Sequence, residues 1–316
     1  MAKISVIIPL YNKEKHIKET LDSLCNQTVT DFEAIVVDDG SSDRSAEIVK
    51  KYDDPRVHLI SKPNEGVSLT RNFGVEKANA PLIAFLDADD LWAPQHLERL
   101  LDLVTACPEA GLFATAYQKK YANNITLPID TPLQNKEAGW MGYVDDFFKA
   151  SLIDCIAWTS AVAIPKVIFQ EHQGFDAKIT HGAGEDTDLW VRIALSHKVA
   201  YTNTITATHV MDSENRISNT PTLKRSYMNL DAYEEQAKTN SSLKRFLDIN
   251  RFSFALQHKM AGDTKTAKAY QHKIDPNHLN AKQRALLNLN AKSLIRLRKF
   301  QDYLRHKRLY LSPFKR

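Results

Sequence analysis

Two aspartates, Asp87 and Asp89, are separated by one alanine and stand just after the apolar run 82–86. In extended backbone, side chains two positions apart point to the same side, so both carboxylates would face one ligand. Such oxygen donors suit Mg2+ or Mn2+, which keep water and substrate phosphates among their ligands. Because the motif is short and common, a solvated turn is the more frequent explanation when it occurs in isolation.

A second acidic cluster repeats this arrangement nearer the N-terminus. Asp38 and Asp39 follow the apolar run 34–37 and precede Gly40 and two serines. Open α/β sheets bind ligands beyond the carboxyl ends of their strands. Both acidic clusters are therefore expected where a ligand would bind, provided that the apolar runs are strands of one sheet.

Short apolar runs alternate with helical patterns in the first third of the sequence. The runs predict strands over residues 4–9, 32–37, 56–61 and 82–87. The other segments predict helices over residues 12–25, 45–52, 66–79 and 94–105. We expect Asn12 to cap the first helix. The alternation predicts βαβ units, and therefore an α/β fold with a mostly parallel sheet.

Several well-known binding motifs are absent from the sequence. No GxxxxGK[ST] occurs, and Tyr-Asn-Lys-Glu-Lys-His stands where a GxGxxG would follow the first strand. The absence of GxSxG and CxxC excludes the simple hydrolase and zinc-ribbon patterns. Three widely spaced cysteines, a short N-terminal apolar run and the lack of a long apolar stretch lead us to expect a cytoplasmic protein.

Three segments, taken in order, resemble the signatures of the family-2 inverting glycosyltransferases, which have the GT-A fold. They cover residues 5–43, 64–90 and 182–194, and the resemblance extends over about residues 4–209. It implies transfer of a hexose from a nucleotide-sugar, expected to be a UDP-sugar, to a hydroxyl of a glycan or lipid-linked acceptor in cell-surface polysaccharide synthesis. It also implies Mn2+ or Mg2+ as cofactor, and so favours a metal site over the solvated turn.

The resemblance implies a set of donor-binding residues. Pro9, Tyr11 and Asn12 would form the edge of the nucleotide-base pocket. Asp39 would read the base, accepting a hydrogen bond from a ring N–H if the base is uracil. Arg71 would hold the pocket or a phosphate, with a surface arginine on a helix as the alternative.

The remaining implied roles concern the metal and the chemistry. Asp87 would contact the ribose or the metal, and Asp89 would bind the metal directly. His209 would complete the metal or diphosphate site, with a structural histidine as an equal alternative. Asp186 would be the general base that takes the proton of the acceptor hydroxyl, and Glu185 would orient the acceptor or the loop.

Two other functions stay open on the sequence alone. A nucleotidyltransferase could have a related α/β sheet with paired carboxylates, although no Gly-rich phosphate loop follows the first strand. A degenerate nucleotide-sugar-binding module would have lost activity, although Asp39, Asp89 and Asp186 are all present. Titration with UDP, with and without Mn2+, separates these interpretations from a metal-dependent transferase.

The charge of the chain is unevenly distributed, and this suggests two parts. Residues 241–316 contain 18 Lys and Arg against 4 Asp and Glu, whereas the preceding residues contain 24 against 34. We expect a GT-A catalytic domain over 1–220 and a basic helical C-terminal extension over 221–316. The amphipathic segment 294–311 would either contact the inner face of a membrane peripherally or pack on the catalytic domain. No nucleic-acid partner is expected, because no recognition module accompanies the charge.

Overall fold

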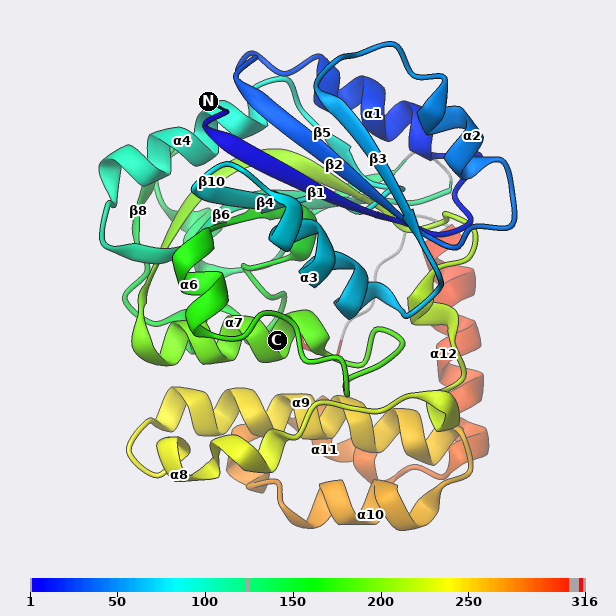
Figure 1. The fold of residues 1–316 in the computed structure, drawn as a ribbon. Coiled ribbons are helices and arrows are strands. Elements are labelled where there is room, and N and C mark those ends of the chain that lie inside the picture. The colour runs from blue at the N-terminus through cyan, green and yellow to red at the C-terminus, as the bar shows by residue number, and fades with distance from the viewer. Residues whose placement is uncertain (1, 123–124, 307–312, 315–316) are drawn as a thin grey trace. The chain divides into compact units, whose positions relative to one another are not determined.

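The computed structural model describes residues 2–122, 125–306 and 313–314 of the chain (Figure 1). Its contacts divide the chain into two compact units. Unit 1 contains Met1–Phe147, Ile156–Asn219 and Ser226–Met228. Unit 2 contains Phe148–Cys155, Thr220–Arg225 and Asn229–Arg316.

Unit 1 is built around a mixed, mostly parallel sheet with the strand order β3-β2-β1-β4-β9-β6-β10-β5, to which β7 and β8 add at β6 and β10. The strands are β1 Ile4–Leu10, β2 Phe32–Asp39, β3 Val57–Lys62, β4 Leu82–Phe85, β5 Leu91–Trp92, β6 Ala110–Lys120, β7 Thr126–Pro128, β8 Met141–Tyr143, β9 Val162–Pro165 and β10 Lys198–Val210. The helices before β10 are α1 Ile17–Cys25, α2 Ser45–Lys50, α3 Val67–Lys77, α4 His96–Ala106, α5 Phe147–Ala150, α6 Lys166–Glu171 and α7 Glu185–Ser196. Short 3-10 turns occur at η1 Pro132–Asn135, η2 Thr159–Ala161 and η3 Ile217–Asn219.

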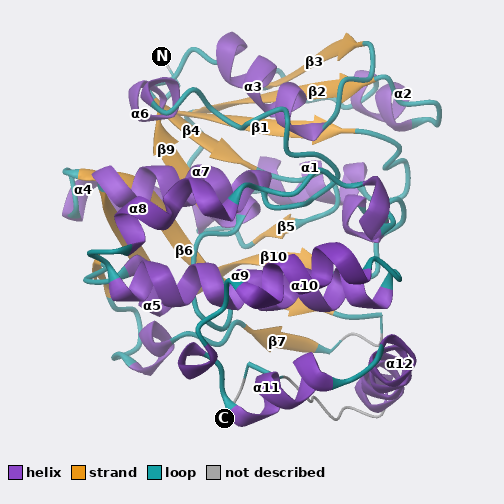
Figure 2. Cartoon of the chain, turned by 90° about the horizontal axis from the view of Figure 1, so that it is seen from below, coloured by secondary structure: helices purple, strands orange, loops and turns teal. Residues whose placement is uncertain are grey.

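The predicted α/β fold is confirmed in the four strands that carry the acidic clusters. The strands β3, β2, β1 and β4 are parallel neighbours, and Figure 2 shows β1, β2 and β3 pointing the same way. Leu10 pairs with Asp38 across β1 and β2, so the two strands end at the same level. The carboxyl ends of these strands therefore form one edge of the sheet, as the alternation of strands and helices predicts.

Apart from Ser5, β1 is apolar, because both of its faces are covered. Val6, Ile8 and Leu10 are buried in one cluster with residues of α1 and α4. On the other face α3 packs against β1 and β2. The contact is close at Gly74, where a Cβ would lie 2.4 Å from a methyl carbon of Ile7. A glycine at this point lets the helix that carries Arg71 approach the sheet.

Two local features differ from the sequence-based expectations. The central strand β6 was not predicted, although its buried residues Ala110–Tyr117 form an apolar run of the kind seen in buried strands. Asn12 was expected to cap the first helix, and this is wrong. The helix begins at Ile17 after His16, whereas Asn12 has a φ of 52° and its Oδ1 accepts a hydrogen bond from the Ser42 N–H.

Unit 2 confirms the helical pattern after residue 222, since all of its regular elements in the described part of the chain are helical. Besides residues 148–150 of α5, they are η4 Thr222–Lys224, η5 Leu230–Tyr233, α8 Glu234–Ala237, α9 Ser241–Met260, α10 Thr264–His272, η6 Pro276–His278, α11 Ala281–Asn288 and α12 Ala291–His306. Arg251 on α9 is fully buried and forms ion pairs with Asp231, Glu234 and Asp248. Since Asp231 lies in η5 and Glu234 in α8, this network ties α9 to both elements. Removal of any one of these carboxylates would leave the buried charge of Arg251 under-compensated.

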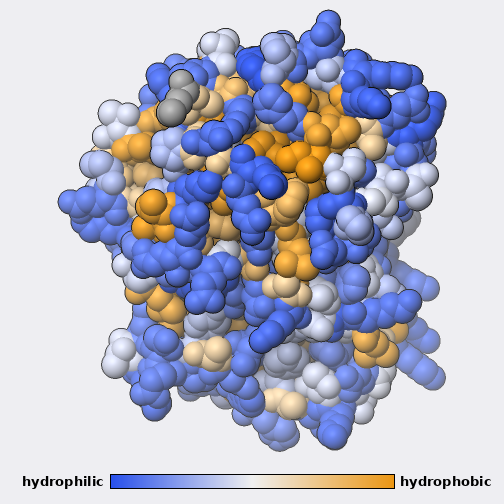
Figure 3. Space-filling model, viewed as in Figure 1, coloured by the Kyte–Doolittle hydropathy of each residue, from blue (hydrophilic) through white to orange (hydrophobic). Residues whose placement is uncertain are grey.

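No helix in the described part of the chain is both long and apolar enough to cross a membrane. Hydrophilic residues prevail over much of the molecular face drawn in Figure 3. The basic amphipathic segment expected over 294–311 is helical as far as His306, and its residues 307–311 lie outside the described residues.

Candidate active site

The ends of β1 and β2 form the first part of the site. Asp38 closes the loop after β2, because its Oδ1 accepts a hydrogen bond from the Ser41 N–H at 3.0 Å. Tyr11, just beyond β1, exposes 46% of its surface. Pro9 lies within β1, where it pairs with Val37. This edge of the sheet therefore exposes the aromatic ring of Tyr11 beside the loop after β2, which Asp38 and Asn12 hold in place.

Asp39 is buried and is held by several donors. Its Oδ1 accepts from Lys62 Nζ at 2.7 Å and from the Glu65 N–H at 2.9 Å, and its Oδ2 accepts from the Gly66 N–H at 2.9 Å. Burial alone would raise the pKa of this carboxyl, but Lys62 and the two backbone N–H groups outweigh it and lower the pKa. Asp39 is thus a fixed anion that joins β2 to the segment leading into α3.

Arg71 connects two acidic parts of the site. The side chain lies on α3 and is 4% exposed, so the surface alternative for this arginine is wrong. Its NH2 donates to Asp87 Oδ1 at 2.6 Å, and its NH1 lies 3.8 Å from Glu185 Oε1. Among the described residues, Arg71 Nε and NH1 and Glu185 Oε2 have no hydrogen-bond partner. Buried polar atoms without partners are rare and require an explanation, such as a ligand.

The segment with the paired aspartates is a turn and not extended backbone, so the premise that placed both carboxylates on one side is wrong. The Asp90 N–H donates to the Asp87 carbonyl at 3.0 Å, which closes the turn. Asp90 itself is buried and accepts from Ser160 Oγ at 2.7 Å and from the Val210 N–H at 3.1 Å. Burial, together with Asp89 and Asp87, raises the pKa of Asp90 well above its usual range. Asp90 thus fastens the turn to β10 and η2.

Asp89 is paired with a lysine from the other side of the site. Lys13 Nζ donates to Asp89 Oδ2 at 2.6 Å and to the Glu214 carbonyl at 2.6 Å. Ser213 Oγ also donates to Asp89 Oδ2. Burial of Asp89 opposes its ionisation, yet the charge and hydrogen bond of Lys13 outweigh burial and lower its pKa. The structure thus holds Asp89 as an anion next to a cation.

His209 lies at the end of β10 and stacks on Trp158 with a centroid separation of 4.6 Å. Its Nε2 is 2.9 Å from Arg216 NH2, which can only donate, so Nε2 accepts. Burial and the charge of Arg216 lower the pKa of His209 to about 3, so the ring is neutral. A neutral imidazole can bind a metal, but here its acceptor nitrogen faces a guanidinium.

Glu185 and Asp186 open α7 directly after a Gly-rich turn. Gly184 adopts a φ of 103°, and a Cβ there would lie 2.9 Å from Met228 Sδ, so glycine fits both the backbone and the space. Asp186 Oδ1 accepts from the Thr187 N–H at 2.6 Å, and Oδ2 accepts from Thr159 Oγ1 at 3.3 Å. Both acids therefore lie at the N-terminal end of α7, where the helix dipole is positive.

The two neighbouring acids of α7 differ in their surroundings. Glu185 is 5% exposed, whereas Asp186 is half-buried. Burial, and then the charge of Asp186, raise the pKa of Glu185 to about 7, against the opposing effect of Arg71. Asp186 is therefore the more accessible of the two carboxylates, and Glu185 is held between charges.

Four residues that link the predicted site residues were missed by the sequence reasoning: Lys13, Thr159, Ser160 and Ser213. Ser160 Oγ accepts from the Asp87 N–H at 3.0 Å, while the adjacent Thr159 donates to Asp186. The turn η2 thus joins the second acidic cluster to α7. Only the short spacing of Lys13 from the end of β1 could have pointed to it in advance, whereas an ordinary serine or threonine carries no such signal.

Asp89 is the residue that would hold a divalent cation at this edge, in place of its present pairing with Lys13. Asp89 is an ionised carboxylate whose Oδ2 accepts from Lys13 and Ser213. The donor's diphosphate and water would complete the coordination shell of the metal ion. The role of His209 as a ligand stays a prediction, since Arg216 occupies its acceptor nitrogen. Within the described residues, the one group of three or more close metal-ligating side chains lies elsewhere in unit 1.

A family model described as "Glycosyl transferase family 2" matches residues 5–162. A protein of Rickettsia bellii named "Uncharacterized glycosyltransferase" is 33% identical over 201 residues, which are 61% of this chain and 26% of that protein. The Validoxylamine A glucosyltransferase of Streptomyces hygroscopicus subsp. limoneus is 28% identical over 228 residues, which are 60% of this chain and 47% of that protein. The matched part spans only 26%, 31% and 29% of the first three curated relatives.

Solved structures of S. aureus TarS have a similar fold. The complex of TarS 1–349 with UDP-GlcNAc has a TM-score of 0.61 and 18% sequence identity, and the similarity covers 92% of this chain and 88% of that chain. A longer TarS structure has a TM-score of 0.61 and 22% identity, and covers 92% of this chain and 53% of that chain. At these identities the similarity establishes the fold alone, and it confirms the expected GT-A type.

Proposed function

Because the chain belongs to glycosyl transferase family 2, we propose that it is an inverting glycosyltransferase that moves a hexose from a UDP-sugar to a hydroxyl group. TarS, which shares its fold, has been solved with UDP-GlcNAc and with UDP, and this supports a uridine nucleotide as the donor. The acceptor we propose is a glycan or a lipid-linked sugar of the cell surface. The proposed catalytic domain covers residues 1–220.

One observation carries this proposal. Asp87, Asp89 and Asp186 come from segments about 100 residues apart, yet the turn η2 hydrogen-bonds to both segments. A transferase needs a diphosphate-binding group and a proton acceptor on opposite sides of one sugar, and carboxylates from two segments that η2 joins can supply both. Arg71 and Glu185 each have buried polar side-chain atoms without a hydrogen-bond partner, and this favours a polar ligand next to them.

The residues act on the donor as follows. Tyr11 stacks on the base, and Asp39, already an anion, accepts a hydrogen bond from its ring N–H. Arg71 and Lys13 place positive charge near the diphosphate, where negative charge accumulates as the bond to the anomeric carbon breaks. A Mn2+ or Mg2+ ion held by Asp89 would supply further charge neutralisation of that leaving group.

The acceptor is activated by the acids of α7. As the acceptor oxygen forms its bond to the anomeric carbon, its proton passes to Asp186. The oxygen attacks from the face opposite the departing diphosphate, so the configuration of the sugar inverts. Glu185 is a positioning residue in this proposal, because its burial against Arg71 fixes the start of α7.

Purified protein should hydrolyse one member of a panel of nucleotide-sugars slowly, and its affinity for UDP should rise when Mn2+ is added. Slow hydrolysis of the donor without acceptor is expected because water can replace the acceptor hydroxyl. Released UDP and calorimetric titration give the two readouts. A preference for a nucleoside triphosphate would favour the nucleotidyltransferase alternative, and UDP binding without any hydrolysis or transfer would favour a binding module.

We also propose that the basic extension, residues 221–316, contacts the inner face of an anionic membrane from the cytoplasm through its helix α12. Leu294 on α12 is buried, and α12 packs against α9 within unit 2. The next residues expose apolar and basic side chains together: Ile295, Leu297, Phe300, Arg296, Arg298 and Lys299. Mixed apolar and basic exposure is typical of a helix that lies in a membrane interface.

The double variant Arg296→Glu/Lys299→Glu should bind vesicles containing phosphatidylglycerol at least ~10-fold more weakly than the wild type, since each basic residue contributes about 1 kcal/mol at an anionic surface. Vesicle co-sedimentation measures this, and added salt should weaken wild-type binding too. The matched control is Lys265→Glu/Lys268→Glu, which reverses the same charge on exposed positions of α10. If both double variants bind alike, α12 is not the contact.

A further inference from the structure

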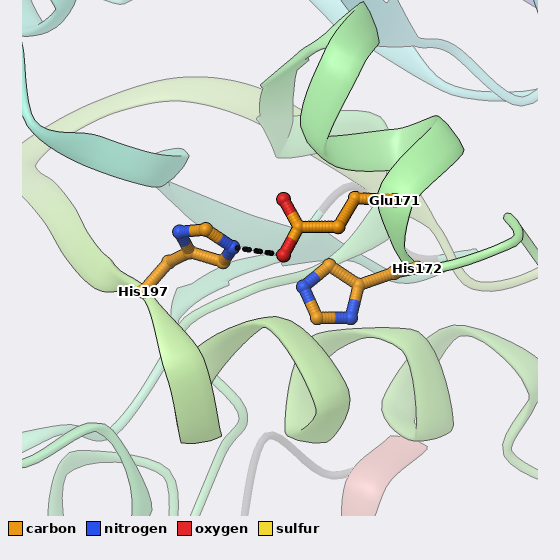
Figure 4. A group of neighbouring side chains, drawn as sticks. All are labelled: Glu171, His172 and His197. Atoms are coloured by element: carbon orange, nitrogen blue, oxygen red, sulfur yellow. Dashed lines mark hydrogen bonds and ion pairs between the residues drawn. The ribbon is translucent and has the colours of Figure 1, made fainter.

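Three metal-ligating side chains meet where two helices of unit 1 end, away from the site described above. Glu171 is the last residue of α6 and His172 follows it, while His197 directly follows α7. One ligand atom of each lies within 4.8 Å of the others, and Figure 4 shows the side chains converging. Two imidazoles and one carboxylate form a ligand set that prefers Zn2+ to Mg2+ or Mn2+.

The spacing of the three groups suits a small cation. Zn2+ binds nitrogen and oxygen at about 2.0–2.2 Å, so two tetrahedral ligand atoms lie about 3.4 Å apart. His197 Nε2 and Glu171 Oε1 are already 3.3 Å apart. The ligand atom of His172 lies within 4.8 Å of the other two, so it must move closer to join them around one ion. A water molecule would complete the tetrahedron.

Both imidazoles are oriented by their neighbours. Ser196 Oγ lies 3.2 Å from Nε2 of His172, the ring nitrogen that faces the other two side chains in Figure 4. This hydroxyl holds the ring in place and would give up that nitrogen to a metal ion. His197 is seated against Gly111 at the start of β6, where a Cβ would come within 2.6 Å of His197 Cβ. The glycine thus makes room for this histidine.

The local charges also favour a cation. The carbonyl ends of α6 and α7 both contribute negative potential, although α6 is short. Two cations are close in the chain, Arg192 and Lys198, and Lys198 pairs with Glu109. Arg192 pairs with Asp188 at 2.9 Å and donates to the Gly174 carbonyl at 2.8 Å, which balances its charge.

We propose that Glu171, His172 and His197 bind one Zn2+ ion at the surface of unit 1. This site is separate from the donor site and independent of the proposed transfer reaction. Because its ligands come from the ends of two different helices, the ion would tie α6 to α7. Binding to the folded state alone would raise the thermal stability of the protein.

The test is a titration of the metal-free protein with Zn2+ against a chromophoric chelator, together with thermal unfolding. The wild type should bind one equivalent with an apparent affinity at least ~10-fold above that of His172→Gln/His197→Gln. Zn2+ should raise the melting temperature of the wild type and not that of this variant. Glu171→Gln, which retains both histidines, should bind with intermediate affinity.

The matched control removes two exposed histidines elsewhere, in His58→Gln/His272→Gln, because the chain contains 11 histidines that could bind Zn2+ weakly. This variant should retain the wild-type affinity. Equal loss of affinity in the two double variants would mean adventitious coordination by surface histidines and would overturn the proposal. Unchanged binding in both would place the ion elsewhere and would overturn it as well. Circular dichroism of each metal-free variant checks that the fold is intact.

Discussion

Replacing Asp186 by Asn should lower sugar transfer by at least ~10², while donor binding survives. Asparagine has the shape of aspartate but cannot accept the proton of the acceptor hydroxyl. Its carbonyl oxygen can still accept from the Thr187 N–H, and its NH2 group can donate to Thr159 Oγ1. The start of α7 should therefore keep its structure. Transfer at saturating donor and UDP affinity are measured in parallel.

The neighbouring variant Glu185→Gln serves as the comparison. Glu185 is buried and its role is proposed to be positioning, so transfer should fall less than in Asp186→Asn. If Glu185→Gln loses transfer while Asp186→Asn retains it, the two acids have been assigned the wrong way round. If both lose UDP binding equally, the segment belongs to the donor site and the base lies elsewhere.

Replacing Asp89 by Ala should abolish transfer and greatly weaken the metal-dependent part of UDP binding. Asp89 is the one carboxylate proposed to hold the cation that neutralises the leaving diphosphate. The variant leaves Lys13 without the partner that now lies at 2.6 Å. Asp89→Asn is therefore measured beside it, because asparagine can still accept a hydrogen bond from Lys13 but carries no charge.

Both Asp89 variants are assayed for transfer with Mn2+ and with chelator, and for UDP affinity under both conditions. Asp53→Ala, which removes an exposed aspartate from the same unit, should behave like the wild type. Near-wild-type turnover of Asp89→Ala in the presence of chelator would show that the metal assignment is wrong. In that case Lys13, whose ammonium pairs with the Asp89 carboxylate, would be tested as the group that neutralises the diphosphate.

Much of the fold could be predicted from the sequence because its signals are local. A β-branched run such as 4–9 is buried on both faces wherever it lies in a parallel sheet, and helical patterns between such runs leave few topologies. Strand β6 escaped prediction although its residues 110–117 are apolar, since a short apolar run has no periodicity that separates strand from helix. Asn12 was misassigned because its side chain bonds to a loop 30 residues away.

The sequence by itself determined the family, the α/β class and the acids at the ends of the strands, because residue types and their spacing are local properties of the chain. Only the tertiary structure decided which groups these acids contact. Arg71 meets Asp87 and Glu185, Lys13 meets Asp89, and η2 joins the turn after β4 to α7. These pairs bring together residues that lie 16 to 114 positions apart along the chain. No local pattern encodes such contacts, because a charge is attracted to whichever opposite charge the packed sheet brings near it.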